Sequence, residues 1–99
     1  MEKELERWLG QELKKLGCIY MKFVSPGNDG VPDRIVVMPG GDVVFVELKS
    51  ETGRLSHTQA FQIARLQQKG AMVFLISNKI EARDLLMLAE LKYDVFCAP

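Results

Sequence analysis

Three charged residues stand where apolar strands are expected to begin or end. Asp33 begins one apolar run, and Glu47 and Lys49 close the next one. Charged side chains are costly to bury in strands, so their presence there suggests a function. Because side chains alternate along a strand, Glu47 and Lys49 point to one face and Leu48 to the other. If the two runs form a hairpin, two carboxylates and an ammonium gather at one end of a sheet.

Two converging carboxylates suit a hard divalent cation such as Mg²⁺ or Mn²⁺. Such a cation lowers the pKa of bound water and stabilises charge on a phosphoryl group. A neighbouring lysine can orient the attacking oxygen or neutralise developing charge. These groups together would be suited to hydrolysing a phosphodiester bond. The pattern alone also fits a plain ion pair between Glu47 and Lys49 on an edge strand.

The hairpin register decides whether the carboxylates can share a metal. Directly opposed residues of an antiparallel pair share a face, and a slip of one residue reverses every side chain. A two-residue turn at 40–41 would place Asp33 and Glu47 on opposite faces. A three-residue loop at 40–42 would pair Asp33 with Lys49 and restore a common face, and a bulge near Glu47 would also do so. We therefore expect either that loop or a bulge.

The hydrophobic pattern predicts an α/β domain with the element order α-β-β-β-α-β-α-β. Helices are expected over 2–16, over 56–69, and from Ser77 or Asn78 to about 91; strands are expected over 18–24, 33–38, 43–49 and 72–76, with a short edge strand over 93–96. Residues 72–76 lack polar alternation, which predicts a strand buried on both faces. Ser56 and Gln59 have the spacing of a helix capping box.

Composition limits the classes of protein to which the chain can belong. The 99 residues suit one domain over 1–99, and 47% hydrophobic with 26% charged residues indicates a globular chain. Thirteen basic and 13 acidic residues exclude a polybasic arm. Cys18 and Cys97 lie in apolar runs, which predicts that both are reduced thiols in the core of an intracellular protein. The sequence has no C-x-x-C motif, which argues against a thioredoxin-like redox role. No run approaches the roughly 18–20 apolar residues of a membrane helix, and the acidic Met1–Glu4 segment does not fit a signal peptide.

Several segments together resemble the VRR-NUC domain, a branch of the PD-(D/E)XK nuclease superfamily. They are Gly30–Arg34, Val46–Lys49 and Ser56–Gln59, followed by Leu66 and Gly70. The resemblance runs from the first helix to about Ile76. It implies a restriction-endonuclease-like αβββαβ core, with a mixed central sheet flanked by helices. It also implies divalent-metal hydrolysis of phosphodiester bonds and no organic cofactor.

The resemblance assigns roles to individual residues of the hairpin and of the following helix. It implies Asp33 and Glu47 as metal ligands, the Leu48 carbonyl as a possible third, and Lys49 as the catalytic lysine. Gln59 matches a family glutamine that is expected near the active site. Position N3 of a capping box also explains Gln59, and both roles can hold together.

The family also uses a glutamate on the first helix. Glu2 lies nearer the apolar face of that helix, whereas Glu6 has the better spacing to Gly17, and both remain candidates for the metal site. Lys22, Arg34 and Arg54 flank the expected site and could contact DNA phosphates. A solvated surface role fits each of these residues equally well.

Free-standing members of this size resemble homodimeric Holliday-junction resolvases of phages and bacteria. The resemblance implies branched DNA as substrate, a homodimer, and the cytoplasm of a bacterial or phage-infected cell. The final helix is the expected dimer surface because it has more apolar residues than one buried stripe needs: Ile80, Leu85, Leu86, Met87, Leu88 and Leu91. The alternative is a non-catalytic nucleic-acid-binding or assembly subunit. The intact Asp33, Glu47 and Lys49 set argues against it, because a degenerate copy would be free to lose one.

Overall fold

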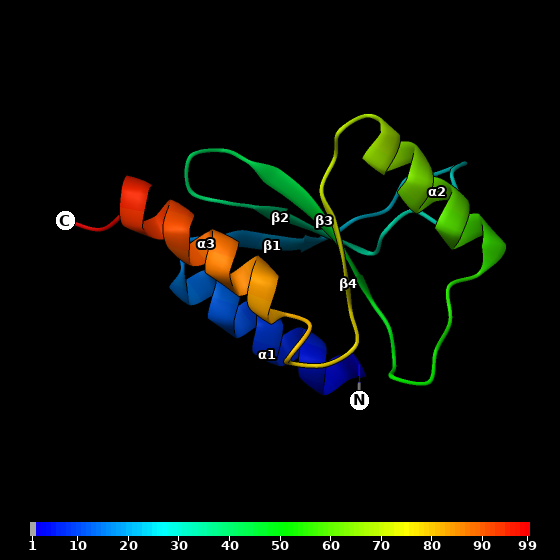
Figure 1. Cartoon of the computed structure of the whole chain (residues 1–99), viewed down its shortest axis with the longest axis horizontal. Helices are drawn as coiled ribbons and strands as arrows, with labels where there is room; N and C mark the ends of the chain where they lie inside the picture. The colour runs from blue at the N-terminus through cyan, green and yellow to red at the C-terminus, as the bar shows by residue number, and fades with distance from the viewer. Residues whose placement is uncertain (1) are drawn as a thin grey trace.

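The structure is a computed structural model that describes the backbone of residues 2–99 and the side chains of residues 3–99. Over this range the chain forms three helices and one four-stranded sheet (Figure 1). The elements are α1 (Glu2–Lys15), β1 (Ile19–Lys22), β2 (Arg34–Val37), β3 (Val43–Leu48), α2 (His57–Gln68), β4 (Val73–Ile76) and α3 (Arg83–Phe96). The sheet order is β1-β2-β3-β4, with β4 parallel to β3 and the other pairs antiparallel. This arrangement confirms the predicted mixed α/β fold with an αβββαβ core.

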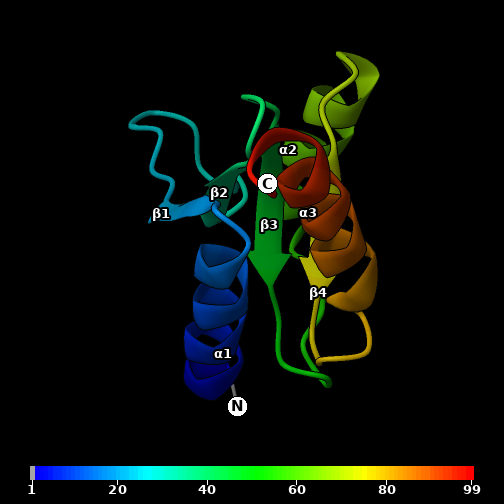
Figure 2. The same ribbon diagram turned by 90° about the vertical axis from the view of Figure 1, so that its left-hand side faces the viewer.

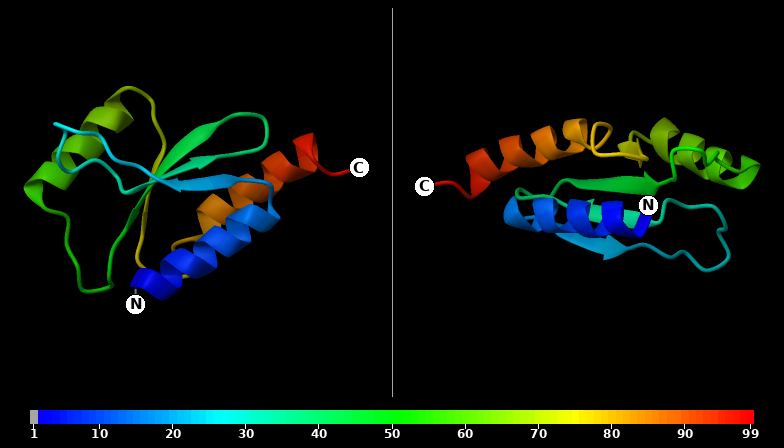
Figure 3. Two further views of the ribbon diagram at one scale, coloured as in Figure 1. Left: turned by 180° about the vertical axis from the view of Figure 1, so that it is seen from behind. Right: turned by 90° about the horizontal axis from the view of Figure 1, so that it is seen from below.

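The core lies between the sheet and two of the helices. Apolar residues of α1 recur at spacings of four, so Leu5, Leu9 and Leu13 form one buried stripe. They share a core with buried strand residues such as Val44 and with Leu85 of α3. Figures 1 and 3 show α1 and α3 along one part of the sheet, whereas α2 stands apart near its other end. Figure 2 shows β3 descending beside α1 toward the N-terminal end of that helix.

A three-residue loop joins β2 to β3, which is one of the two alternatives that the sequence analysis predicted. The Met38 N–H donates to the Asp42 carbonyl at 2.8 Å, which leaves 39–41 as the loop, one residue earlier than expected. The described β2–β3 ladder pairs Arg34 with Val46 and runs without a bulge. Continuing this register by one residue places Asp33 opposite Glu47. The expected pairing of Asp33 with Lys49 was therefore wrong, but the common face was predicted correctly.

The segment 93–96 is the last turn of α3, so the predicted edge strand there was wrong. Two contacts with the hairpin hold this end of the helix: Lys92 pairs with Asp42 at 2.6 Å, and the Phe96 ring packs on Gly40. A Cβ at Gly40 would collide with the Phe96 ring, and the φ of +91° at this position also favours glycine. The helix also begins later than predicted, at Arg83, because the preceding residues form a separate turn.

Strand β4 is not buried on both faces, contrary to its sequence pattern. Leu75 is 46% exposed, and only Ile76 is fully buried. The strand lies at the edge of the sheet, and α2 covers only part of the face that Leu75 shares with Glu47. An apolar run without polar residues is therefore compatible with a half-open edge.

Two further expectations concern thiols and membranes. Cys18 is a buried free thiol, but Cys97 is exposed at the end of α3, so the expectation of a second core thiol was wrong. In the part of the chain that the structure describes, no helix combines the length and apolar character needed to cross a membrane.

Candidate active site

Asp33 and Glu47 lie beside each other on neighbouring strands and share one face of the sheet. The backbone holds Asp33 in place, since its carbonyl accepts a hydrogen bond from the Phe23 N–H at 2.9 Å. Its side-chain Oδ1 accepts from the Leu48 N–H at 3.4 Å. Glu47 is only 4% exposed, although it is an acidic residue. Both predicted carboxylates therefore stand at the same end of the β2–β3 hairpin.

The side chain of Gln59 connects α2 to the end of β3. Its Nε2 donates to Glu47 Oε2 at 3.2 Å, and its Oε1 accepts from Lys49 Nζ at 3.1 Å. The same Oε1 accepts from the Ser56 N–H at 2.9 Å, while Ser56 Oγ accepts from the Gln59 N–H at 3.1 Å. The predicted capping box is confirmed. One amide group thus begins the helix and holds the glutamate and the lysine in fixed positions.

The electrostatic environment of Asp33 disfavours its charged form. Burial raises the pKa of Asp33, and nearby Glu6 raises it further. The Leu48 N–H and the Arg34 guanidinium favour the carboxylate and lower the pKa, but burial is the larger effect. A cation bound at Asp33 would favour the ionised form, because an opposite charge within a few ångströms stabilises it.

The donor set fits a hard divalent cation. Asp33 and Glu47 offer carboxylate oxygens, which are the ligands that Mg²⁺ and Mn²⁺ prefer. Among residues with described side chains, no three His, Cys, Asp or Glu groups gather as a metal-binding cluster. A cation that keeps several of its waters suits such a sparse protein ligand set, and Mg²⁺ is the typical example.

Of the two candidate glutamates of α1, only Glu6 has a described side chain. Glu6 forms an ion pair with Arg34 at 2.5 Å, and Arg34 directly follows Asp33. Glu6 is therefore engaged by a guanidinium on the α1 face of the sheet, opposite to the face of Asp33 and Glu47, although its charge still acts on Asp33. The side chain of Glu2 lies outside the described residues.

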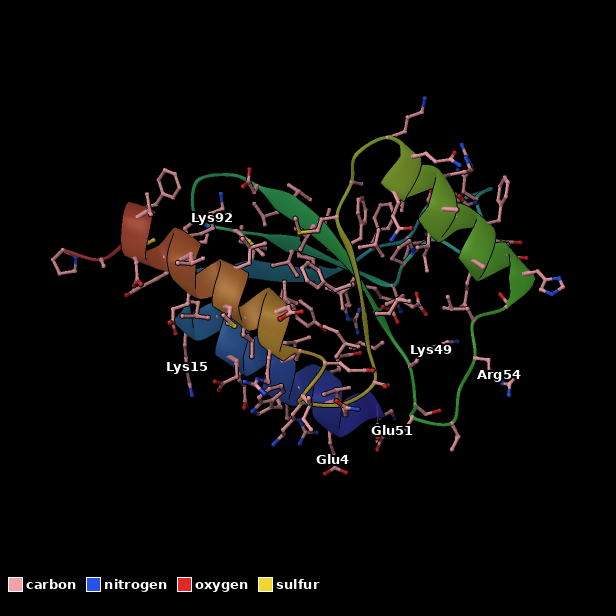
Figure 4. All side chains as sticks on the ribbon, viewed as in Figure 1. Glu4, Lys15, Lys49, Glu51, Arg54 and Lys92 are labelled. Carbon is pink, nitrogen blue, oxygen red and sulfur yellow. The ribbon has the colours of Figure 1, made fainter. Side chains whose placement is uncertain are left out.

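The other two predicted DNA contacts stand on different sides of the site. Lys22, at the end of β1, is paired in register with Arg34 and is exposed. Arg54 is exposed on the loop between β3 and α2, some residues beyond Lys49 (Figure 4). A cavity of about 690 Å³ also opens beside Lys49, between α1 and the loops that follow β3 and β4.

Two residues hold the loop before Asp33 against α2: Gln62, which sequence reasoning missed, and Gly30, which begins the Gly30–Arg34 motif. Gln62 is buried, and its Nε2 donates to the Asp29 carbonyl at 3.1 Å. Gly30 has a φ of +89°, and a Cβ there would lie 2.7 Å from backbone atoms of Thr58. A sequence signal for Gln62 does exist, because it follows Gln59 by three residues and so lies on the same helix face.

Comparisons with known proteins agree on one family. The model of the family described as VRR-NUC domain matches residues 18–79, which include Asp33, Glu47, Lys49 and Gln59. The chain is 40% identical over 78 residues to "Putative nuclease p44" of Acyrthosiphon pisum secondary endosymbiont phage 1, covering 79% of this chain and 84% of that protein. A solved structure described as "VRR_NUC domain" has a TM-score of 0.80 and 26% identity, covering 87% of this chain and 94% of that one.

Proposed function

The chain belongs to the VRR-NUC family of nuclease domains, and from this premise we propose that it is a divalent-metal-dependent endonuclease that cuts branched DNA. The observation that carries the proposal is the hydrogen-bonded chain from Glu47 through Gln59 to Lys49, with Asp33 on the neighbouring strand. Two carboxylates and one ammonium therefore stand at one end of the sheet, as a metal-dependent hydrolase would need. A protein that only bound DNA would have no evident use for a buried, hydrogen-bonded glutamate there.

Each residue of the site has one proposed role. Asp33 and Glu47, with the Leu48 carbonyl, hold the cation; nucleases of this superfamily generally use divalent metals. When bound, the cation supplies charge stabilisation at the phosphoryl group and activates water at neutral pH. Lys49 neutralises charge that develops on the scissile phosphate or orients the attacking oxygen. Gln59 keeps the lysine ammonium beside the glutamate and so limits its rotamers.

The test is a cleavage assay on a four-way junction, a flap, a splayed arm and a linear duplex side by side. Each substrate is incubated with Mg²⁺, with Mn²⁺ and with EDTA. We expect metal-dependent cleavage that favours the branched substrates, and its loss in Asp33→Ala and Glu47→Ala. Asp42→Ala is the matched control, because Asp42 is a carboxylate of the same hairpin that pairs with Lys92. Full activity in Asp33→Ala, or binding without cleavage under every condition, would contradict the proposal and favour the non-catalytic alternative.

A second assay separates catalysis from substrate binding at Lys49. If the lysine acts on the reacting phosphate, Lys49→Ala lowers the turnover number far more than it lowers DNA affinity. Binding is measured in EDTA and turnover at saturating DNA. A variant that binds much more weakly but cuts at the normal rate when saturated would make Lys49 a phosphate anchor.

We further propose that the active molecule is a two-fold homodimer in the cytoplasm of a bacterial or phage-infected cell. Cutting two strands of a junction symmetrically needs two active sites, which a two-fold axis provides. Met87, Leu91 and Val95 of α3 are spaced by four residues and are 61%, 62% and 72% exposed. Their neighbours Leu85, Leu86 and Leu88 pack inward. The outer stripe of α3 is therefore the proposed contact surface.

A further inference from the structure

A groove between α1 and the β1–β2 pair is lined mainly by cations. Its volume is about 640 Å³. The basic residues that line it are Lys3, Arg7, Lys14, Lys22 and Arg34. Among the side chains that the structure describes, Glu6 is the only carboxylate that lines it, and Glu6 is already paired with Arg34. Because the whole chain carries 13 basic and 13 acidic residues, this groove concentrates positive charge that the composition conceals.

The cations come from α1 and from the paired strands β1 and β2, which lie beside it. On α1, Lys3, Arg7 and Lys14 are spaced by four and seven residues, so they lie on one side of the helix. On the strands, Lys22 and Arg34 are directly paired, an arrangement of like charges that weakens a sheet unless an anion compensates. Glu6 compensates Arg34, whereas no other described carboxylate lines the groove beside its lysines.

The shape of the groove suits an extended anion. Gly10 lies between the basic positions of α1 and lets the Tyr20 ring pack closely against the helix, since a Cβ there would lie 3.1 Å from the ring. Lys3 and Lys14 are 11 residues apart on the helix, which corresponds to about 16 Å at 1.5 Å per residue. One DNA strand spans that length in roughly five nucleotides at about 3.4 Å each.

The groove reaches the catalytic end of the sheet. Arg34 immediately follows Asp33, so its side chain lies on the α1 face of the sheet, opposite to Asp33. The groove is connected to the site around the sheet end, because Arg7 and Gln11 line both the groove and the cavity that contains Lys49. We propose that the groove holds one sugar–phosphate backbone of the DNA substrate beside the scissile phosphate, an inference that rests on the proposed function. Contacts of this kind fix the position of DNA without reading its sequence. The groove would therefore contribute to selectivity for the shape of DNA.

The experiment measures DNA affinity over a salt series. A fluorescently labelled duplex is titrated with Lys14→Gln, Lys22→Gln and wild-type protein in EDTA, and fluorescence anisotropy reports binding. Loss of one phosphate contact lowers the slope of log affinity against log salt by about 0.9. We expect that decrease, with weaker binding, in each groove variant. Lys15→Gln is the matched control, because Lys15 is adjacent on α1, pairs with Glu12 and does not line the groove. It should bind like wild type.

The outcomes separate this proposal from that of catalysis. The proposal that the groove binds DNA would be wrong if the groove variants had the same affinity and the same salt dependence as Lys15→Gln. It would also be wrong if the wild-type protein did not bind DNA. If the groove variants bind like Lys15→Gln, metal-dependent cleavage that is abolished by Asp33→Ala would still support the proposed nuclease function. Conversely, DNA binding that depends on the groove residues but is not followed by cleavage would support the groove proposal and contradict the proposed catalysis.

Discussion

Asp33 is a residue at which folding and the proposed metal binding make opposite demands. Burial raises its pKa, so the native protein binds a proton more tightly than the unfolded chain does. Between the ordinary and the raised pKa, the free energy of unfolding therefore falls as pH rises. Asn at this position keeps an oxygen for the Leu48 N–H but carries no charge. In metal-free buffer at neutral pH we expect Asp33→Asn to unfold at a higher temperature than wild type.

Thermal unfolding followed by circular dichroism over a pH series tests this expectation. The advantage of Asp33→Asn should disappear below the ordinary pKa of a carboxyl group, where both proteins are uncharged at this site. Added Mg²⁺ should raise the unfolding temperature of wild type and leave that of the variant unchanged, because only a folded site with both carboxylates binds the ion. A variant less stable than wild type at pH 7 would show that hydrogen bonding outweighs burial.

Gln59 has two roles that two substitutions can separate. Gln59→Glu keeps the capping box, since glutamate at N3 serves equally well. It also replaces the donor to Glu47 by a second carboxylate, which repels it. We expect near-normal unfolding temperature but strongly reduced cleavage in Gln59→Glu. Gln59→Ala should lose activity together with the side-chain half of the capping box, whereas the N–H of residue 59 still donates to Ser56 Oγ. Normal cleavage by Gln59→Glu would show that Gln59 serves only to cap the helix and has no role in catalysis.

At the level of elements, the loop before Asp33 and the start of α2 form one unit. Ala at Gly30 would have to adopt a φ of +89° and would collide with the Thr58 backbone. We expect Gly30→Ala to cost roughly 3 kcal/mol and to lower turnover, since it displaces the helix turn that carries Gln59. Gly27→Ala is the control: its φ is also positive, +81°, but nothing lies within 4 Å, so it should cost only about 1 kcal/mol. Denaturant unfolding with a cleavage assay measures both.

The hairpin was predictable because its determinants are local. Apolar runs on both sides of a glycine-containing segment predict two strands. Because Asp33 and Glu47 must share one face of the sheet, a three-residue loop or a bulge is expected between or within the strands. The choice of 39–41 over 40–42 depends on contacts that the local sequence does not specify. Phe96 packs on Gly40 and Lys92 pairs with Asp42. The same contacts keep residues 93–96 helical, where β-formers alone suggested a strand.

The site was predictable to the extent that its residues are close in sequence. Asp33, Glu47 and Lys49 occupy one hairpin, and Gln59 begins the next helix. The cationic groove could not be recognised in the same way. Its charges come from both α1 and the first two strands, and each charge alone resembles a solvated surface residue. Only the packing of α1 beside β1 brings them to one surface.

For the whole molecule, the exposed stripe of α3 determines the expected assembly. If Leu91 lies at the centre of a two-fold interface, Leu91→Lys should change a dimer into a monomer, because it places a charge in an apolar contact. Light scattering at micromolar protein measures the mass. Phe61→Lys is the control, since Phe61 is 61% exposed and Leu91 is 62% exposed. A wild-type monomer that still cuts both strands of a junction symmetrically would contradict the dimer.

The pairing of Asp33 with Glu47 also restricts how this chain can change in length during evolution. A single insertion or deletion within β2 or β3 would turn one carboxylate to the opposite face of the sheet, so selection for cleavage should remove it. An insertion in the 39–41 loop leaves both strands in register. Gly40 is closed in by Phe96, but a side chain at Gly41 would meet nothing within 4 Å. Length differences among active descendants should therefore accumulate next to Gly41, and the strands should keep their length.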